Sequence, residues 1–444
     1  MRDSLSGSGY TGEYQAFVRQ FARATPSWLD TIRQCAFQRF EALGFPTTKN
    51  EDWHFTSVAP IVEAAYPPRT APGGDVKPTD LTPFTFGVSD WPTIVFVNGV
   101  FAPALSSLEA LPEGVKVYDM ATAFRTSEAL VERHLSRFAA YELNTFTALN
   151  SAFVSDGAVV RIAKEFEVAR PIHILFVSDA IAAKTQSNPR TLIIAERNSK
   201  ATVIESYVAT GEASYFTNAV TEVLLEDGAN LSHLKIQRES PRAFHVGTIE
   251  AEQKRDSHYQ SFSFATGAAL SRTNIYTTLN GEGAGATLNG LYMLDGEQHC
   301  DHQTKIEHAQ PNCFSRELYK GVLDGASHGV FNGKVYVDPI AQKTDGKQTN
   351  KVLLLSERAQ VDTKPQLEIF ADDVKCTHGA TVGRVDETAL FYMKSRGINK
   401  ELARRLLTYA FAAEVLETIE IDRVRQELEQ ATLQRFTGIE VSSV

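Results

Sequence analysis

Cysteine is scarce in this chain of 444 residues, which contains four: Cys35, Cys300, Cys313 and Cys376. No two of them are closer than Cys300 and Cys313, so the sequence has no Cys-x-x-Cys pair. This spacing excludes the dense disulfide framework of small secreted proteins and the paired cysteines of a structural zinc site. We expect four reduced thiols, since a lone cysteine usually serves as a small buried hydrophobic side chain.

Positive charge is also in short supply, with 44 Lys and Arg against 54 Asp and Glu and a formal net charge of −10. Binding to nucleic acid needs clustered Lys and Arg that neutralise phosphates, so we expect no nucleic-acid partner. Apolar runs such as 172–177 are far shorter than the ~20 residues that span a bilayer, so we expect no membrane contact. Residues 1–9 lack the basic and apolar parts of a signal peptide, and we therefore expect a cytoplasmic protein.

Nucleotide-binding motifs are missing as well. Residues 329–334 contain Gly-Lys, but three residues separate the two glycines and no Ser or Thr follows the lysine, so this is no phosphate-binding loop. Residues 281–286 match a loose Gly-x-Gly-x-x-Ala pattern, but a strand-like run follows where a dinucleotide site needs a helix. The sequence therefore predicts neither an ATP site nor a catalytic site.

Helical patterns open the chain. We expect helices over 11–22 and 26–43, with Thr25 as the N-cap of the second and Gly44 at its end. Up to residue 157 the pattern then mixes a strand with two further helices: 93–97, 127–139 and 144–153.

Strand-like runs follow one another from about 157 to 371, almost without a helix. They are 158–162, 172–177, 191–195, 201–208, 219–225, 231–236, 257–264, 273–279, 288–293, 335–337 and 367–370. Small-residue turns such as Gly228-Ala229 and Gly325-Ala326 introduce several of them, at uneven intervals. Irregular recurrence permits a parallel β-helix, whose coils tolerate loops of variable length, but a β-sandwich stays open on pattern alone.

Helical patterns return after residue 385, over 387–396, 400–421 and 423–434, with Asp386 and Asn399 as N-caps of the first two. Apolar residues form two neighbouring stripes on the second helix: Leu402, Leu406, Tyr409, Ala413 and Leu416, and beside them Ala403, Leu407, Ala410 and Phe411. A surface helix needs one such stripe. Either this helix is wedged between two parts of its own chain, or the second stripe binds a partner.

The densest group of potential metal ligands is His299, Cys300, His302 and His308, with Cys313 nearby. If 302–308 is a strand, Cys300, His302 and His308 share one face, because side chains alternate along a strand. A stand-alone metalloenzyme or metal-binding protein would use such a set for a soft metal. The spacing is not that of a structural zinc site, however, and hydrogen-bonded histidines in a β core explain the pattern equally.

A second group, Cys376 and His378, lies near the end of the β region. The two residues are two positions apart and would project from the same face of an extended strand. An imidazole beside a thiol can ligate iron or lower the pKa of the thiol, but a partly buried thiol next to a hydrogen-bonded histidine gives the same pattern.

The segments 348–356, 361–369, 372–381 and 391–398 form one long chain of motifs, and Lys-Asn-Glu-Asp-Trp at 49–53 adds another near the N-terminus. Together they resemble the SufB/SufD family of iron–sulfur cluster assembly proteins, continuously over roughly 300–420. The chain lacks the upstream cysteine-rich motif typical of SufB-like members, and its run 375–381 is similar to the SufD-type branch.

This resemblance implies a mainly β fold: a right-handed parallel β-helix core with helical N-terminal and C-terminal subdomains. It favours the β-helix over the β-sandwich. The regions would be an N-terminal helical region and linker (1–75), a mixed α/β lead-in (76–156), the parallel β-helix core (157–385) and a C-terminal helical subdomain (386–444).

The resemblance also implies a function. Members of the family act with a SufB-like paralogue and a SufC-like ABC-type ATPase, so this chain would be a non-catalytic scaffold subunit and ATP hydrolysis would belong to the partner. It would aid iron delivery and cluster formation at the paralogue interface. We expect no tightly bound cofactor in the isolated chain, only a transient iron–sulfur cluster or iron in the complex.

Site residues follow from the same resemblance. His378 matches the histidine thought to face a cysteine of the SufB-like paralogue as a cluster ligand or iron site, and Cys376 lies beside it. The family binds its ATPase through the C-terminal helical part, here Arg396, Gly397, Ile398, Leu402, Leu406, Leu407, Tyr409 and Phe411. Without the paralogue, the open strand edge could instead pair with a second copy of this chain.

Overall fold

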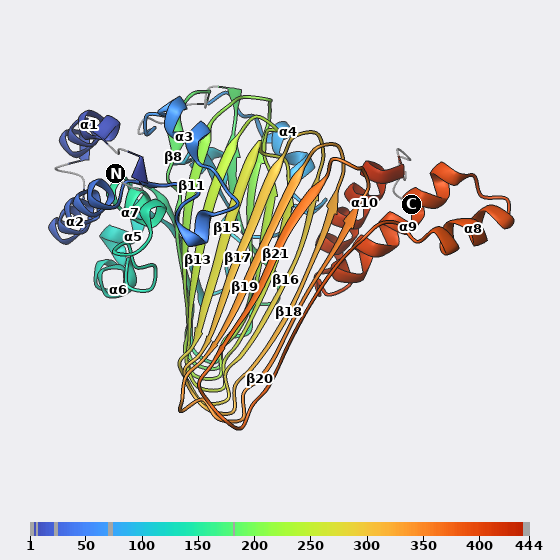
Figure 1. Cartoon of the computed structure of the whole chain (residues 1–444). Coiled ribbons are helices and arrows are strands. Elements are labelled where there is room, and N and C mark those ends of the chain that lie inside the picture. The colour runs from blue at the N-terminus through green and yellow to red at the C-terminus, as the bar shows by residue number, and fades with distance from the viewer. Residues whose placement is uncertain (1–3, 6–7, 22–24, 70–73, 181–182, 438–444) are drawn as a thin grey trace.

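Two β-sheets dominate the computed structural model, which describes residues 4–5, 8–21, 25–69, 74–180 and 183–437 (Figure 1). Sheet one contains, in spatial order, β22 (Lys375–Gly383), β20 (Asp345–Leu354), β18 (Phe314–Leu323), β16 (Gly285–Leu294), β14 (His258–Thr266), β12 (Asn230–Arg238), β10 (Lys200–Ala209), β7 (Ile172–Ser178), β3 (Thr93–Val97) and β4 (Val100–Phe101). Sheet two contains β21 (Gln360–Ile369), β19 (His328–Val337), β17 (His299–His308), β15 (Leu270–Leu279), β13 (Phe244–Gln253), β11 (Phe216–Leu225), β9 (Arg190–Ala195), β6 (Gly157–Ile162) and β5 (Val115–Asp119), while β8 (Gln186–Ser187) pairs with β11.

From β9 onward, successive strands alternate between the two sheets. Neighbouring strands within each sheet run parallel over this part of the chain. Within these two sheets, the antiparallel pairs among the described strands lie at the ends, between β3 and β4 and between β5 and β6. This is the parallel β-helix that the resemblance implied, flattened into two walls. The β-sandwich alternative is excluded, since its sheets are antiparallel.

The coils of the β-helix are nearly equal in length. Successive strands of sheet one align at Lys200, Asn230, His258, Gly285, Phe314, Asp345 and Lys375, so a coil takes 27 to 31 residues. The turns looked uneven in the sequence because they belong to two interleaved series. Gly228-Ala229 precedes a strand of sheet one, whereas Gly325-Ala326 precedes a strand of sheet two.

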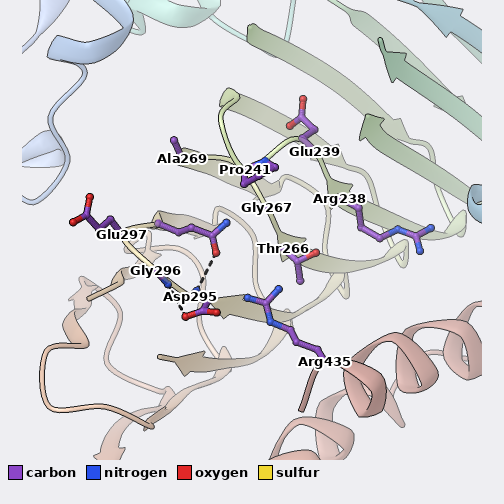
Figure 2. Close-up of a pocket in the computed structure, with 11 residues that line it drawn as sticks. Arg238, Glu239, Pro241, Thr266, Gly267, Ala269, Asp295, Gly296, Glu297 and Arg435 are labelled. Atoms are coloured by element: carbon purple, nitrogen blue, oxygen red, sulfur yellow. Dashed lines mark hydrogen bonds between the residues drawn. The ribbon is translucent and has the colours of Figure 1, made fainter. Parts of the chain in front are cut away.

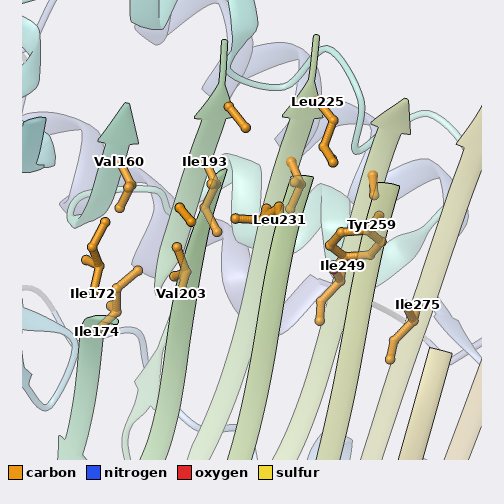
Figure 3. Packing of buried hydrophobic residues seen from close by; sticks show 14 of the residues in the cluster. Val160, Ile172, Ile174, Ile193, Val203, Leu225, Leu231, Ile249, Tyr259 and Ile275 are labelled. Atoms are coloured by element: carbon orange, nitrogen blue, oxygen red, sulfur yellow. The ribbon is translucent and has the colours of Figure 1, made fainter. Parts of the chain in front are cut away.

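The inner faces of the two walls form the hydrophobic core (Figure 3). Val203 and Leu231 from one wall belong to the same buried cluster as Ile249 and Ile275 from the other. Alternation along each strand sends these side chains inward and their neighbours outward. Burying each such side chain contributes roughly 1.5–3 kcal/mol relative to leaving it exposed.

Glycine makes room for large rings inside the later coils. A Cβ atom at Gly290 would lie 2.3 Å from the ring of Tyr319, and one at Gly321 would lie 2.4 Å from the ring of Tyr292. Both tyrosines are fully buried. Close packing of this kind leaves no space for a larger side chain at either glycine.

Most of the N-terminal elements lie on one side of the β-helix, whereas the short helix Pro78–Leu81 lies toward the C-terminal helices, where Leu81 packs against β3 and β7 of sheet one (Figure 1). The helices are α1 (Thr11–Phe21), α2 (Ser27–Leu43), α3 (Ala59–Ala64), α4 (Pro78–Leu81), α5 (Met120–Thr126), α6 (Glu128–His134) and α7 (Thr145–Ala152). Short 3₁₀ turns occupy Ser8–Tyr10, Glu51–Trp53, Thr82–Phe84 and Pro103–Leu105, and the strands β1 (Ser4–Leu5) and β2 (Phe45–Pro46) pair antiparallel. Helix α7 packs between α2 and β11, which joins the helical region to sheet two.

One N-cap and one helix end in the N-terminal region differ from prediction. Pro26, not Thr25, is the N-cap of α2, because the Thr25 hydroxyl donates to the carbonyl of Phe21 and to Asp30 instead of capping the helix. The helix expected over 127–139 ends at His134, since Ser136 has a left-handed φ of 58° that a continuing α-helix does not allow. Residues 70–73 of the expected linker lie outside the described ranges.

The C-terminal helices α8 (Glu387–Ser395), α9 (Lys400–Leu416) and α10 (Asp422–Thr437) lie on the opposite side (Figure 1). Asp386 and Asn399 cap the first two as predicted, each accepting a backbone N–H in the first turn. Helix α9 ends at Leu416, earlier than expected, and packs against β16 and β18 of sheet one. None of the described helices combines the length and apolar composition that crossing a bilayer needs.

Candidate functional site

The last coil of the β-helix is open. Among the described strands, β22 pairs only with β20 and β21 only with β19, so each has a free edge. Most side chains of β22 are exposed, whereas those of β20 largely alternate between half-buried and buried. A free edge presents unpaired backbone N–H and C=O groups that another strand can bind.

Cys376 and His378 share one face of β22, as the alternation predicted. In register, Cys376 lies beside Gly346 and His378 beside Gln348. Gly346 and Gln348 are buried positions of the inner face, so Cys376 and His378 continue that face at its uncovered end. His378 is exposed and Cys376 is half-buried, which places an imidazole and a thiol together within reach of a second molecule.

The thiol of Cys376 is not activated in the isolated chain. Partial burial raises its pKa above the usual value, and a hydrogen bond from the backbone of Gly346 offsets only part of that effect. A thiolate at this position therefore needs a further cause, such as a bound metal, which deprotonates a thiol outright.

A polar layer lies directly beneath these two residues. The side-chain amide of Gln348 donates from Nε2 to Oε2 of Glu317 at 2.7 Å, and both side chains are buried. Burial raises the pKa of Glu317 to about 7. Asn350, two residues along β20, donates from Nδ2 to the hydroxyl of Thr363 at 3.0 Å.

The predicted metal cluster at 299–308 does not form. Cys300, His302 and His308 do face the interior, but His299 lies on the outer face of β17. Cys300 Sγ lies 3.6 Å from His302 Nδ1, whereas His308 lies six residues, or roughly 20 Å, further along the strand. Among the residues that the structure describes, no group of three or more His, Cys, Asp or Glu is arranged to hold a metal.

Each of these side chains has another explanation. His308 is hydrogen-bonded to Ser315 at 2.9 Å, and burial lowers its pKa to about 4. Burial also lowers the pKa of His302 to about 3 and raises that of Cys300 to about 12, so both are neutral. They act as core side chains, and the geometry gives no support to a metal site at this cluster.

The N-terminal motif 49–53 is a clamp on the outer face of sheet two. The Trp53 ring stacks on the guanidinium of Arg272, with 3.7 Å between the centroid and Cζ. Arg272 in turn donates to Asp301 at 2.7 Å and to the carbonyl of Asp52. Glu51 reaches Lys364 on β21 at 2.8 Å, so the clamp extends to the last coil.

The C-terminal helices present only part of the predicted ATPase-binding set to solvent. Leu402, Leu406, Leu407, Tyr409 and Phe411 are half-buried. The fully buried face of α9 consists of other residues: Ala403, Thr408, Ala412, Val415 and Leu416. The Phe411 ring lies 4.4 Å from Lys320 Nζ on β18 and packs against the core, so the interpretation of a wedged helix holds for this residue.

Two exposed aromatic residues lie on α8, outside the apolar stripes predicted for the following helix. Phe391 is 73% exposed and Tyr392 is 59% exposed, on the helix that points away from the β-helix (Figure 1). They precede Arg396, which is also exposed, and Gly397, whose φ of 88° ends the helix. Only the motif 391–398 could have drawn attention to them.

Other features of the chain lie apart from this end. Residues 325–329 do read Gly-x-Ser-x-Gly, but Ser327 is buried and its hydroxyl donates to the carbonyl of Asp324, so it is no nucleophile. A hollow of about 770 Å³ lies at the ends of strands of sheet one, lined among others by Arg238, Glu239 and Arg435 (Figure 2). It contains none of the predicted site residues.

Comparisons with known proteins agree with this architecture. Residues 176–411 match the family model described as SUF system FeS cluster assembly, SufBD core domain, and residues 6–174 match the SufBD protein N-terminal region. The chain is 33% identical to the iron–sulfur cluster assembly protein SufD of Escherichia coli over 405 residues, which is 90% of this chain and 92% of that protein.

Two further relatives cover as much. The iron–sulfur cluster assembly SufBD family protein slr0076 of Synechocystis is 32% identical over 90% of this chain and 89% of its own length. SufD of Bacillus subtilis is 30% identical over 93% of this chain and 96% of its own length. The chain therefore belongs to the SufB/SufD family of iron–sulfur cluster assembly proteins.

Proposed function

We propose that this chain is a non-catalytic scaffold subunit of a SUF complex, which assembles iron–sulfur clusters where the open end of its β-helix meets a SufB-like paralogue. The main support is the pair Cys376 and His378, held on one face of an uncovered terminal strand. Thiolate and imidazole are both ligands of iron–sulfur clusters and of iron.

Two ligands fill only half of a four-ligand site, so the remaining ligands would come from the docked chain. The free edge of β22 offers backbone groups for strand pairing with that chain, and strand addition would bring the partner's side chains beside Cys376 and His378. Iron or a cluster is cargo at this interface, and we assign no resident cofactor to the isolated chain.

We assign ATP hydrolysis to a SufC-like ATPase bound at the C-terminal helices. Phe391 and Tyr392 give α8 an exposed aromatic surface, with Arg396 beside it. Aromatic residues and arginine are the side chains that most often dominate the binding energy of protein interfaces. Helix α9 would support this surface from within the chain. The expected cytoplasmic location stays a prediction.

The site is tested by co-expressing the chain with its paralogue and ATPase and purifying the complex without oxygen. We expect His378→Ala to leave the complex intact but to remove most iron, sulfide and visible absorption, with a smaller loss for Cys376→Ala. Thr377→Ala, on the opposite face of the same strand, is the matched control and should retain the cluster. If the His378→Ala complex carries as much cluster as the wild type, the chemistry lies wholly on the partner.

The ATPase surface needs its own test. Phe391→Ser combined with Tyr392→Ser should abolish co-purification of the ATPase while the circular dichroism of the β-helix stays unchanged. Leu143→Ser removes an 83% exposed side chain from the N-terminal side of the molecule and should not affect the ATPase. Substituting Phe411 would be uninformative, because its ring also contacts Lys320 in the same chain. Unchanged ATPase binding by the double variant would refute this surface.

A further inference from the structure

Glu317, Gln348 and His378 occupy neighbouring inward positions on the last three strands of sheet one. Glu317 on β18 is in register with Gln348 on β20, which is in register with His378 on β22. Adjacent strands lie roughly 4.8 Å apart, so Gln348 is the nearest inward neighbour of His378 on its own wall.

The amide of Gln348 is fixed in one orientation. Its Nε2 donates to Glu317 Oε2 at 2.7 Å, and the ionised carboxylate, which predominates above its raised pKa of about 7, can only accept, so in that form the nitrogen faces Glu317. Gly333 on the opposite wall provides the space, because a Cβ atom there would lie 2.0 Å from Gln348 Nε2. The carbonyl oxygen Oε1 of Gln348 is then left buried without a hydrogen-bond partner among the described residues.

A histidine that ligates a metal almost always donates its other ring N–H to a carbonyl or carboxylate, which fixes the tautomer and the direction of the ring. We infer that Gln348 is a positioning residue for His378: its Oε1, which has no partner in the described part of the chain, accepts the N–H of the imidazole once the exposed ring turns toward β20, and so directs the other ring nitrogen, with its lone pair, toward the docked chain. This inference rests on the proposed function of His378 as a ligand. Glu317 acts one step further back, by holding the amide of Gln348.

The next inward residue of β20 supplies a matched control. Asn350 is also a buried amide that donates to one neighbour, Thr363, and its Oδ1 likewise lacks a partner. Its neighbour on β22 is Ala380 instead of a histidine. Gln348→Leu and Asn350→Leu therefore remove equivalent buried amides, and only the first changes the surroundings of His378.

The tautomer of His378 is measured directly by long-range ¹H–¹⁵N correlation spectra of the full chain labelled at histidine, with the His378→Ala variant assigning the signal. We expect one neutral tautomer in the wild type and in Asn350→Leu, and a mixture of both tautomers in Gln348→Leu. The same tautomer population in Gln348→Leu as in the wild type would overturn the inference. If Gln348→Leu does not fold, Glu317→Leu keeps Gln348 but frees its amide, and it should produce the same mixture.

Iron content of the co-expressed complex separates the two proposals. In Gln348→Leu we expect at least a ten-fold weaker hold on Fe(II), measured by competition with a chelator, and no change in Asn350→Leu. If His378→Ala loses iron but Gln348→Leu does not, only the positioning role is wrong. If His378→Ala keeps its iron, the proposed function of His378 itself fails.

Discussion

Glu222 on the outer face of sheet two ties the N-terminal helical region to the β-helix, and its removal should be costly. Its carboxylate is fully buried and accepts backbone N–H groups from four successive residues, 136–139, at 2.7 to 3.1 Å. It also pairs at 2.5 Å with Arg190, whose side chain is equally buried. Glu222→Leu would leave a buried cation and four backbone donors without this acceptor.

Breaking a buried ion pair by removing one partner costs about 3–5 kcal/mol, and each stranded donor adds about 1–3 kcal/mol when nothing replaces its acceptor. Because these costs overlap, they do not simply add. We expect Glu222→Leu to lower the free energy of unfolding by at least about 4 kcal/mol, a large share of the roughly 5–15 kcal/mol that is typical of folded domains. Replacing both partners with apolar residues, Arg190→Met with Glu222→Leu, removes the unpaired cation. The double variant should therefore be more stable than Glu222→Leu alone.

Urea unfolding followed by tryptophan fluorescence measures these differences, since Trp28, one of the three tryptophans, packs in the adjoining helical cluster. Glu196→Leu is a suitable control, because its partner Arg161 is 43% exposed. Surface ion pairs typically contribute about 0–1 kcal/mol to stability, so this substitution should cost little. A loss below about 1 kcal/mol for Glu222→Leu, or a double variant less stable than both single variants, would refute the reasoning.

Two further predictions concern the interior of the β-helix. Three histidines are buried there or beside it, with pKa values lowered to about 3 or 4: His173, His302 and His308. The unfolded chain binds their protons first, so these three should lower the stability as the pH drops from 6.5 toward 4, by about 2 kcal/mol per histidine at pH 5. Burial acts in the opposite direction on carboxyl groups, since it raises the pKa of Asp156 to about 6, that of Glu317 to about 7 and that of Glu250 well above its usual value. Among the described residues, histidines with lowered pKa values outnumber the carboxyl groups with raised ones, seven to four, so the urea midpoint should still fall at pH 5, and an unchanged midpoint would contradict this. Gly290→Ala should cost about 1–3 kcal/mol in thermal or urea unfolding because its Cβ would meet the Tyr319 ring, whereas Gly12→Ala, with nothing within 4 Å, should be neutral or slightly stabilising.

The sequence alone indicated an all-β core between helical ends, and the family resemblance selected the β-helix. Hydrophobic alternation located many of the strands, but it missed β5, β13, β18 and β20, and it treated β17 and β22 only as conditional strands. The reason is visible in β20, whose inward positions include Gly346, Gln348 and Asn350. Inside this β-helix polar side chains find hydrogen-bond partners on neighbouring strands, so the apolar pattern that identifies a strand is weak.

The candidate site was predictable to the same limited extent. A spacing of two residues placed Cys376 and His378 on one face of a strand, and the structure confirms that face. The same rule correctly placed Cys300, His302 and His308 on one face. They form no metal site, because His308 lies six residues further along the strand and is too far from the other two to bind the same metal. The stripe containing Phe411 left two alternatives open for another reason, since amphipathic spacing cannot distinguish a helix face that packs on its own chain from one that binds a partner.

A short path of contacts joins α9, the helix behind the proposed ATPase surface, to the strand that carries Gln348. Glu414 on α9 pairs with Lys320 on β18 at 2.5 Å and with Lys351 on β20 at 3.1 Å. Lys351 is three residues from Gln348 on the same strand, and β20 is hydrogen-bonded along its length to β22. A displacement of α9 by a bound ATPase would therefore reach the strand that carries Gln348, and the neighbour that carries His378, without crossing the rest of the β-helix. A short path of this kind would let ATP hydrolysis in a bound ATPase change the position of His378 at the interface with the paralogue.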